Sequence, residues 1–225
     1  MSLEIRPYSP ADRQAVRDIC CETGFMGEPI DPVFADRDAF ADFFTRYYTD
    51  FEPENALVAE EDGRIVGYLL GGLDHRRCSR KQLWLVLTRT VPKVVARILT
   101  GRYNRASLRY LKWFIFRAAR ETPVSIPGAA HFHINILPEY RNGYWGRRFI
   151  FPFMNRVARL GLKGVYGQMQ VYKDRRDEKI FRRYGFRFVD LREITKFKEV
   201  HDDPVWVATI YHEFKTHRNP MRVVQ

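Results

Sequence analysis

Hydrophobic and polar residues follow strand and helix periods along the first third of the chain. Residues 5–8 predict a short strand. Ser9 followed by Pro10 is typical of a helix start, and apolar residues at helical spacing continue to Gly24. Aromatic residues within 34–48 predict a second helix. The chain is therefore expected to open with a strand and two helices.

A hairpin and a helical insertion are predicted next. An Asp-Gly pair separates two apolar runs within residues 56–70, which is a strong local signal for a β-hairpin. Residues 74–128 then carry apolar positions at helical spacing, with breaks expected at Pro92 and around Gly101. We expect residues 74–128 to form a helical insertion.

The second half of the chain alternates strand and helix patterns. Strands are predicted over 131–137, 165–171, 186–197 and 205–214, and helices over 147–160 and 174–184. The first two of these strands enclose a helix, so they should run parallel. The order predicts an α/β fold, a mixed sheet flanked by helices, with the insertion between the third and fourth strands. At 225 residues, one domain over residues 1–225 is expected.

Composition narrows the class of protein. Hydrophobic residues make up 45% of the chain and aromatic residues 15%, which excludes a disordered chain. The N-terminus lacks the apolar core of a signal peptide, and no apolar run reaches the ~18 residues of a membrane-spanning helix. Three cysteines without C-x-x-C spacing argue against a disulfide framework or a zinc site. We expect a cytoplasmic protein with no bound metal.

The positive charge is concentrated in the predicted insertion. The formal net charge is +11, and residues 75–120 contain thirteen Lys or Arg and no Asp or Glu. The rest of the chain, with 25 basic and 27 acidic residues, is close to neutral. The basic segment permits three interpretations: an amphipathic subdomain with solvated cations, a lid that recognises an acidic or phosphate-bearing acceptor, or a docking surface for a membrane or nucleic acid. The first interpretation is favoured, and nucleic acid is the weaker half of the third, because the chain matches no RNA- or DNA-binding module.

Residues 131–149 contain the most informative motif. A strand runs into a glycine-containing loop that opens a helix, and the free N–H groups of a helix start can bind phosphate. Gly143 and Gly146 would let an anion approach the backbone. Three arginines add charge suited to a diphosphate: Arg141, Arg147 and Arg148. An ordinary β-α turn is the alternative interpretation.

Two segments resemble motifs of one enzyme superfamily. Residues 138–148, Pro-Glu-Tyr-Arg-Asn-Gly-Tyr-Trp-Gly-Arg-Arg, are similar to the acyl-CoA loop of the GNAT superfamily of N-acetyltransferases, [Q/R]-x-x-G-x-[G/A], with Arg141 first and Gly146 last. Residues 179–186 resemble the "FYxxxGF"-type segment of the same superfamily. With the hairpin in the expected order, the resemblance covers roughly residues 3–72 and 130–198.

The resemblance implies transfer of an acetyl group from acetyl-CoA to an amine. Two splayed parallel strands would hold the pantetheine arm through backbone groups, and loop amides would hold the pyrophosphate. The acceptor would be a small-molecule or peptide amine, an acidic one included. The implied cofactor-binding residues are Ile136, Leu137, Arg141, Asn142, Gly143, Tyr144, Trp145, Gly146, Arg147, Asp174 and Phe181.

Four positions depart from the superfamily pattern. Tyr144 stands where the first glycine is usual, and Asp174 stands where Asn is common. Phe181 replaces a Tyr that can protonate the leaving thiolate, which leaves the general acid unassigned. Pro152 lies inside the predicted helix and should kink it. These departures keep open a catalytically silent acyl-CoA-binding or basic docking module, and acyl groups other than acetyl.

Alternation places three polar side chains on one face of strand 131–137. His131, His133 and Asn135 share that face, although a central parallel strand is normally apolar on both faces. His133 has an ordinary pKa suited to a general base, and Asn135 could orient substrate or water. Tyr172 is a further candidate for lining the site. The alternative is that these are core or rim residues with satisfied hydrogen bonds and that water relays the proton.

Overall fold

The computed structural model describes residues 3–141, 144–172 and 178–214, and its centre is a seven-stranded mixed sheet in the order β1-β2-β3-β4-β5-β7-β6. The strands are β1 (Leu3–Pro7), β2 (Ala56–Glu61), β3 (Arg64–Gly72), β4 (Ala130–Ile136), β5 (Gly164–Val171), β6 (Arg187–Ile194) and β7 (Val205–Glu213). Among these strands of the described residues, only β4 and β5 pair in parallel. The predicted fold class and the parallel crossover are confirmed.

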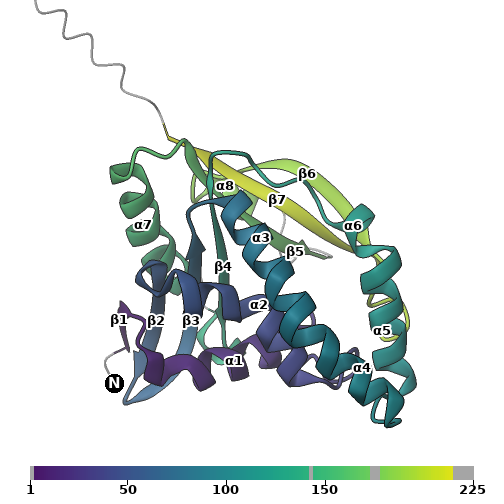
Figure 1. The fold of residues 1–225 in the computed structure, drawn as a ribbon. Coiled ribbons are helices and arrows are strands. Elements are labelled where there is room, and N and C mark those ends of the chain that lie inside the picture. The colour runs from purple at the N-terminus through teal and green to yellow at the C-terminus, as the bar shows by residue number, and fades with distance from the viewer. Residues whose placement is uncertain (1–2, 142–143, 173–177, 215–225) are drawn as a thin grey trace, which may run out of the picture.

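Helices cover the two faces of the sheet (Figure 1). The helices outside the insertion are α1 (Arg13–Glu22), α2 (Arg37–Phe51), α7 (Tyr144–Arg159) and α8 (Glu178–Arg182), with short 3-10 turns η1 (Pro10–Asp12), η2 (Pro53–Asn55) and η4 (Pro138–Tyr140). The ring of Phe132 on β4 contacts Phe153 of α7, whereas the next residue, His133, contacts Phe44 of α2. Alternation along β4 therefore directs one set of side chains toward α7 and the other toward α2.

Local sequence explains where the first helices begin. The predicted helix start at Ser9 is confirmed, because Ser9 and Asp12 form a capping box around η1, which leads directly into α1. The second helix starts at Arg37, later than predicted. Asp36 accepts a hydrogen bond from the Ala39 N–H and so caps α2. Phe34 stays in the preceding loop and is buried in the core.

The insertion is helical, but one of its predicted breaks is wrong. It comprises α3 (His75–Leu85), a π-helical turn η3 (Val86–Thr90), α4 (Val91–Leu99), α5 (Arg105–Phe116) and α6 (Ala118–Glu121). The chain stays helical from α3 to α4 past Pro92, because the π turn bonds the Val91 N–H to the Val86 carbonyl and leaves Pro92 near the start of α4. Gly101, at a φ of +67°, follows the end of α4 as expected.

The helix after β4 begins earlier than predicted. The helix was expected over residues 147–160, but α7 starts at Tyr144 and continues to Arg159 as one element that contains Pro152. Seven residues, 137–143, which include η4, therefore separate the end of β4 from the start of α7 in the chain.

The sheet opens between β4 and β5. Their ladder has three pairs, Ala130–Val165, His131–Tyr166 and Phe132–Gly167, and it ends there. Beyond that point β4 continues to pair with β3, and β5 continues to pair with β7. The two strands therefore separate toward their carboxyl ends, which is the arrangement expected for a ligand arm lying between them.

Candidate functional site

A cavity of about 490 Å³ occupies the region where β4 and β5 separate. Its walls come from both strands, from the first turns of α7, from α8 and from the loop that follows α1. The lining residues used below are Gly27, His133, Ile134, Asn135, Ile136, Arg141, Gly146, Gln168, Gln170, Tyr172, Ile180, Phe181 and Tyr184. Sequence segments from across the whole chain therefore meet at this point.

Backbone groups of β4 face the gap at alternate residues. Leu137 donates its N–H to the Val66 carbonyl of β3 at 3.0 Å, which fixes the hydrogen-bonding phase of the β3–β4 ladder. In an antiparallel ladder, alternate residues direct their N–H and C=O groups to opposite sides. Ile134 and Ile136 therefore direct theirs away from β3, toward the opening. Ile136 was predicted as a binding residue, and Ile134 was missed.

Two predicted binding residues have other partners. Leu137 uses both backbone groups within the chain, since its carbonyl also accepts the Tyr140 N–H at 3.0 Å, and we no longer assign it to cofactor binding. The guanidinium of Arg141 donates to the Ile136 carbonyl at 2.8 Å and to the Gly27 carbonyl at 2.7 Å. Arg141 lines the cavity, but these bonds direct it toward the end of β4 instead of toward a phosphate.

Gly146 lies in the first turn of α7 and faces open space. Of the described residues, a Cβ atom added there would meet within 4 Å only Tyr184, whose hydroxyl lies at 4.0 Å. Glycine inside a helix costs about 1 kcal/mol relative to alanine, and neither backbone strain nor close packing requires it here. A helix start with free N–H groups and room above a glycine suits an anion such as a phosphate.

The remaining predicted residues around this helix start are described only in part. Asn142, Gly143 and Asp174 lie outside the described residues, and of Tyr144 and Trp145 only the helical backbone is described. The exposed Arg147 guanidinium stacks 5.2 Å from the centre of the Phe151 ring. Phe181 of α8 lines the cavity with Ile180 and contacts the Phe188 ring at 5.8 Å.

The polar face of β4 forms a hydrogen-bonded row with tyrosines. His131 Nδ1 is 2.8 Å from the Tyr48 hydroxyl, and the Asn135 amide donates to the Tyr68 hydroxyl at 2.8 Å. Between them, His133 Nε2 is 3.5 Å from the Asn135 amide nitrogen. The other ring nitrogen, Nδ1 of His133, is buried and has no hydrogen-bond partner among the described residues. His133 and Asn135 both line the cavity, so the predicted pair does meet there.

Burial changes the acid–base behaviour of this row. Burial lowers the pKa of His133 to about 4. Burial, with smaller effects from the nearby His133 and His75, lowers the pKa of His131 to about 3. Both imidazoles are therefore neutral at pH 7. The expectation that His133 keeps an ordinary pKa is wrong, because the ring lies between Phe44 and Tyr68 with ring-centre distances of 5.8 and 5.6 Å.

A loop after α1 closes one side of the cavity, a feature that sequence reasoning missed. The Met26 N–H donates to the Gln170 side chain at 3.0 Å, and the Met26 carbonyl accepts the Tyr172 hydroxyl at 2.7 Å. Met26 and Gly27 have positive φ values of 54° and 96°, which bend the loop at this point. The Met-Gly pair and the polar alternation of Gln168 and Gln170 were the available signals. Tyr172, predicted as a lining residue, does line the cavity.

The described residues contain neither a candidate metal-binding cluster nor a candidate membrane-spanning helix. Among residues 3–141, 144–172 and 178–214, there is no group of three or more His, Cys, Asp or Glu that could hold a metal ion. Within the same residues, none of the helices combines the length and apolar character needed to cross a bilayer.

Comparison with known proteins identifies the fold. A crystal structure of a protein named SsHAT has a TM-score of 0.62 at 26% sequence identity, over 95% of this chain and 98% of that one. A GNAT superfamily phosphinothricin acetyltransferase from Sinorhizobium meliloti, in complex with acetyl-CoA, has a TM-score of 0.55 at 16% identity, over 100% and 96% of the two chains. A polyamine N-acetyltransferase of Drosophila melanogaster has a TM-score of 0.55 at 13% identity, over 95% and 100%.

No protein-family model and no curated protein sequence matches the chain. The structural matches nevertheless cover nearly its whole length, so the chain has the fold of the GNAT acetyltransferases. The resemblance inferred from residues 138–148 and 179–186 is thereby confirmed at the level of the fold.

Proposed function

We propose that this protein is an N-acetyltransferase that moves an acetyl group from acetyl-CoA to an amine. One observation carries the proposal: β4 and β5 separate over a cavity that extends to the glycine in the first turn of α7. Solved structures of the same fold include an acetyltransferase with acetyl-CoA bound. When bound, acetyl-CoA would supply an acetyl group activated as a thioester.

The residues present fit such a co-substrate along the length of the cavity. The backbone groups of Ile134 and the N–H of Ile136, whose carbonyl accepts from Arg141, would bind the pantetheine arm in the manner of an added strand. The N-terminal amides of α7 would bind the diphosphate beside Gly146. Ile180 and Phe181 would form an apolar wall beside the arm. These groups hold the reactants close together, which is the main task in direct acyl transfer.

His133 would orient the acceptor. With a pKa of about 4 it is a weak base, but its neutral ring can accept a hydrogen bond from an amine N–H. The same low-dielectric surroundings disfavour a charged ammonium, so the amine would lose its proton to water on entry. Phe181 has no proton to give, so the leaving thiolate would take its proton from another donor or from water.

The lining of the cavity bears on the acceptor. Among its described lining residues the ionisable side chains are histidine, arginine and tyrosine, and none is Asp or Glu. A polycationic amine would find no carboxylate in that described lining to offset its charge. This favours a small-molecule or peptide amine that is neutral or acidic apart from the reacting group.

Thiol release from acetyl-CoA, measured across a panel of neutral, acidic and polycationic amines, tests the proposal. The enzyme should release thiol with at least one amine of the first two groups. The catalytically silent alternative would bind CoA in calorimetry but release no thiol with any of them. Preference for longer acyl chains in the same assay would instead indicate another acyl donor.

A further inference from the structure

The continuous helix formed by α3, η3 and α4 carries an apolar stripe on its outer face. We define the apolar stripe as Leu83, Leu87, Val91, Val95 and Leu99, which recur every four residues from α3 through α4. Their side chains are between 40% and 81% exposed, and Trp84 and Ile98 beside them are also exposed. Helix α4 contributes no fully buried residue to the core. Folded chains rarely leave an apolar surface of this length without a partner.

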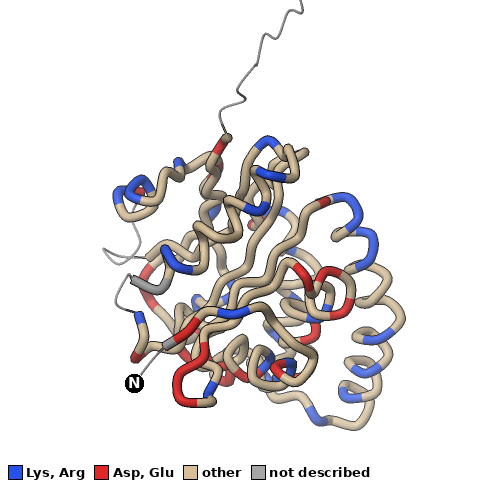
Figure 2. The backbone as a smooth tube through the Cα atoms, turned by 90° about the vertical axis from the view of Figure 1, so that its left-hand side faces the viewer, with Lys and Arg blue, Asp and Glu red and all other residues tan. Residues whose placement is uncertain are grey.

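Cations surround the apolar stripe. Arg76 and Arg80 precede Leu83 by seven and three residues, so they extend the same helix face toward its start. Figure 2 shows Lys and Arg at intervals along the helices on its right-hand side. Across the residues that the structure describes, Arg76, Arg80 and Arg89 form no ion pair with an acidic side chain.

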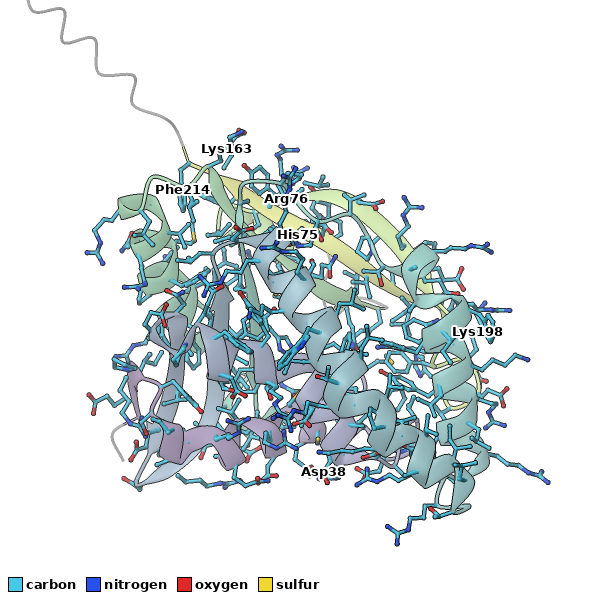
Figure 3. The ribbon with its side chains drawn as sticks, viewed as in Figure 1. Asp38, His75, Arg76, Lys163, Lys198 and Phe214 are labelled. Atoms are coloured by element: carbon cyan, nitrogen blue, oxygen red, sulfur yellow. The ribbon has the colours of Figure 1, made fainter. Side chains whose placement is uncertain are left out.

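Ion pairs hold the other face of this helix to the body of the protein. Lys93 pairs with Asp42, and Arg97 pairs with Asp36 and Asp38 of the segment that begins α2. Figure 3 labels His75 and Arg76 at the start of α3, with Asp38 at the opposite end of the molecule near α4. The ion pairs therefore hold the α4 end of this helix to the body of the protein, and the residues of the apolar stripe remain exposed.

We propose that the apolar stripe and its cations dock this protein on an anionic lipid bilayer. Aliphatic side chains flanked by Arg and Lys are the composition of helices that lie in the membrane interface, where Trp is also favoured. The absence of acidic residues from sequence positions 75–120 gives the segment the charge complementary to such a surface. This inference does not depend on the proposed acetyl transfer.

Two other partners fit the same surface less well. Single-stranded nucleic acid binds through basic grooves with a series of aromatic platforms, whereas the apolar stripe is aliphatic and Trp84 beside it offers one ring and not a series. A second copy of the chain, docked stripe to stripe, would place two basic segments against each other and incur charge repulsion.

Co-sedimentation of the full chain with vesicles tests the proposal. With phosphatidylcholine vesicles containing about 30% phosphatidylglycerol, we expect binding at about 50 mM salt that weakens strongly at about 500 mM. Vesicles of phosphatidylcholine alone should bind at least about tenfold less. No binding to the anionic vesicles at low salt would overturn the proposal.

Paired variants separate the apolar stripe from general surface charge. Leu87→Glu with Val95→Glu should weaken vesicle binding about tenfold or more. The matched control, Leu160→Glu with Val200→Glu, changes the net charge equally at residues of similar exposure and should retain most of the binding. Arg76→Ala with Arg80→Ala should also weaken binding more than Arg159→Ala with Arg183→Ala. All four side-chain pairs are exposed, so circular dichroism should show an unchanged fold.

Three results would contradict docking through this face. If the stripe pair and the control pair weakened vesicle binding equally, the effect would come from the change in net charge and not from the apolar stripe. If the chain bound an oligonucleotide but no vesicles, and the variant Leu87→Glu with Val95→Glu still bound the oligonucleotide, the cations would form a nucleic-acid-binding surface. A lipid-free dimer that the same pair converts to a monomer would make the apolar stripe a self-association surface.

Discussion

The imidazole of His133 lies in the cavity wall with a pKa that burial lowers to about 4. We expect His133→Ala to lower kcat/KM for the amine about 100-fold, because the acceptor loses the group that orients it. CoA affinity should be retained, since Ile134, Ile136 and Gly146 are unchanged. The variant should keep the shape of the wild-type pH–rate profile between about pH 5 and 8, since His133 does not titrate there.

Steady-state kinetics across this pH range, with calorimetry for CoA, provides the measurement. A wild-type limb near pH 6.5 that disappears in His133→Ala would restore His133 as a general base with an ordinary pKa. His133→Asn is a useful second variant, because an amide that accepts the same hydrogen bond should recover part of the lost rate.

The lowered pKa values of His131 and His133 also predict how stability depends on pH. Their folded-state pKa values of about 3 and about 4 lie below the ordinary value of 6.5, so the unfolded chain binds more protons as the pH falls. The stability is present above pH 6.5 and is lost as the pH falls through the folded-state values. Each histidine contributes a slope of up to about 1.4 kcal/mol per pH unit within that window.

Urea denaturation of His131→Gln at several pH values measures this contribution. The glutamine can still bond the Tyr48 hydroxyl but does not titrate. Its free energy of unfolding should therefore depend less steeply on pH than that of the wild type between about pH 6 and 4. Parallel curves would show that His131 is not responsible for the slope.

Gly146 provides the sharpest residue-level test of the phosphate site. An Asp side chain there has room, and a carboxylate in the first turn of a helix favours the helix, so the fold should be retained. The same carboxylate would repel a diphosphate, and we expect CoA affinity to fall at least about tenfold. Gly146→Ala is the matched control. Equal CoA affinities for the two variants in calorimetry would show that this turn does not bind the diphosphate.

At the scale of elements, the short ladder between β4 and β5 depends on Gly167. A Cβ atom at this position would lie 2.9 Å from the Phe132 ring and 3.1 Å from the Met169 methyl group. We therefore expect Gly167→Ala to lower the free energy of unfolding by about 1–3 kcal/mol. Gly146→Ala, which meets open space, should be neutral or slightly stabilising in the same urea titration. Equal stabilities would mean that the packing of Phe132 and Met169 against Gly167 does not support the β4–β5 ladder.

Elements with strong periodicity could be predicted from the sequence. The hairpin around Gly63, the β-α-β unit and the shared polar face of His131, His133 and Asn135 all follow from local spacing, and the structure contains each of them. The break predicted at Pro92 failed because a π turn, which local propensity does not signal, absorbs the missing N–H.

The site itself could be predicted only in part. Side-chain alternation follows from the sequence. Whether the backbone groups of a β4 residue face β3 or the opening beside β5 depends on the register between β4 and β3, which the sequence does not give. For that reason Leu137 was included and Ile134 was missed. The two carbonyls that bind Arg141 come from Gly27 and Ile136, which are far apart in sequence, so no local pattern could reveal them.

For the molecule as a whole, the basic insertion must attach to a nearly neutral body. The carboxylate of Asp36 is almost fully buried, caps α2 and contacts both Arg97 and the Tyr103 hydroxyl of the insertion. Burial raises the pKa of this carboxyl, but the hydrogen bonds from Arg97 and Tyr103 outweigh it and hold the pKa below its ordinary value. Asp36 therefore joins the two parts of the chain as a buried, hydrogen-bonded anion.

Removing that anion should loosen the insertion. We expect Asp36→Ala to lower the free energy of unfolding by about 3 kcal/mol and to speed tryptic cleavage within residues 75–120, because Arg97 loses its buried partner. Asp38→Ala is the matched control: its side chain is 66% exposed and also pairs with Arg97, so its loss should cost less than about 1 kcal/mol. Urea titration and timed proteolysis measure both effects. Equal effects for the two variants would mean that apolar packing alone, such as the contact between Phe43 and Phe114, holds the insertion in place.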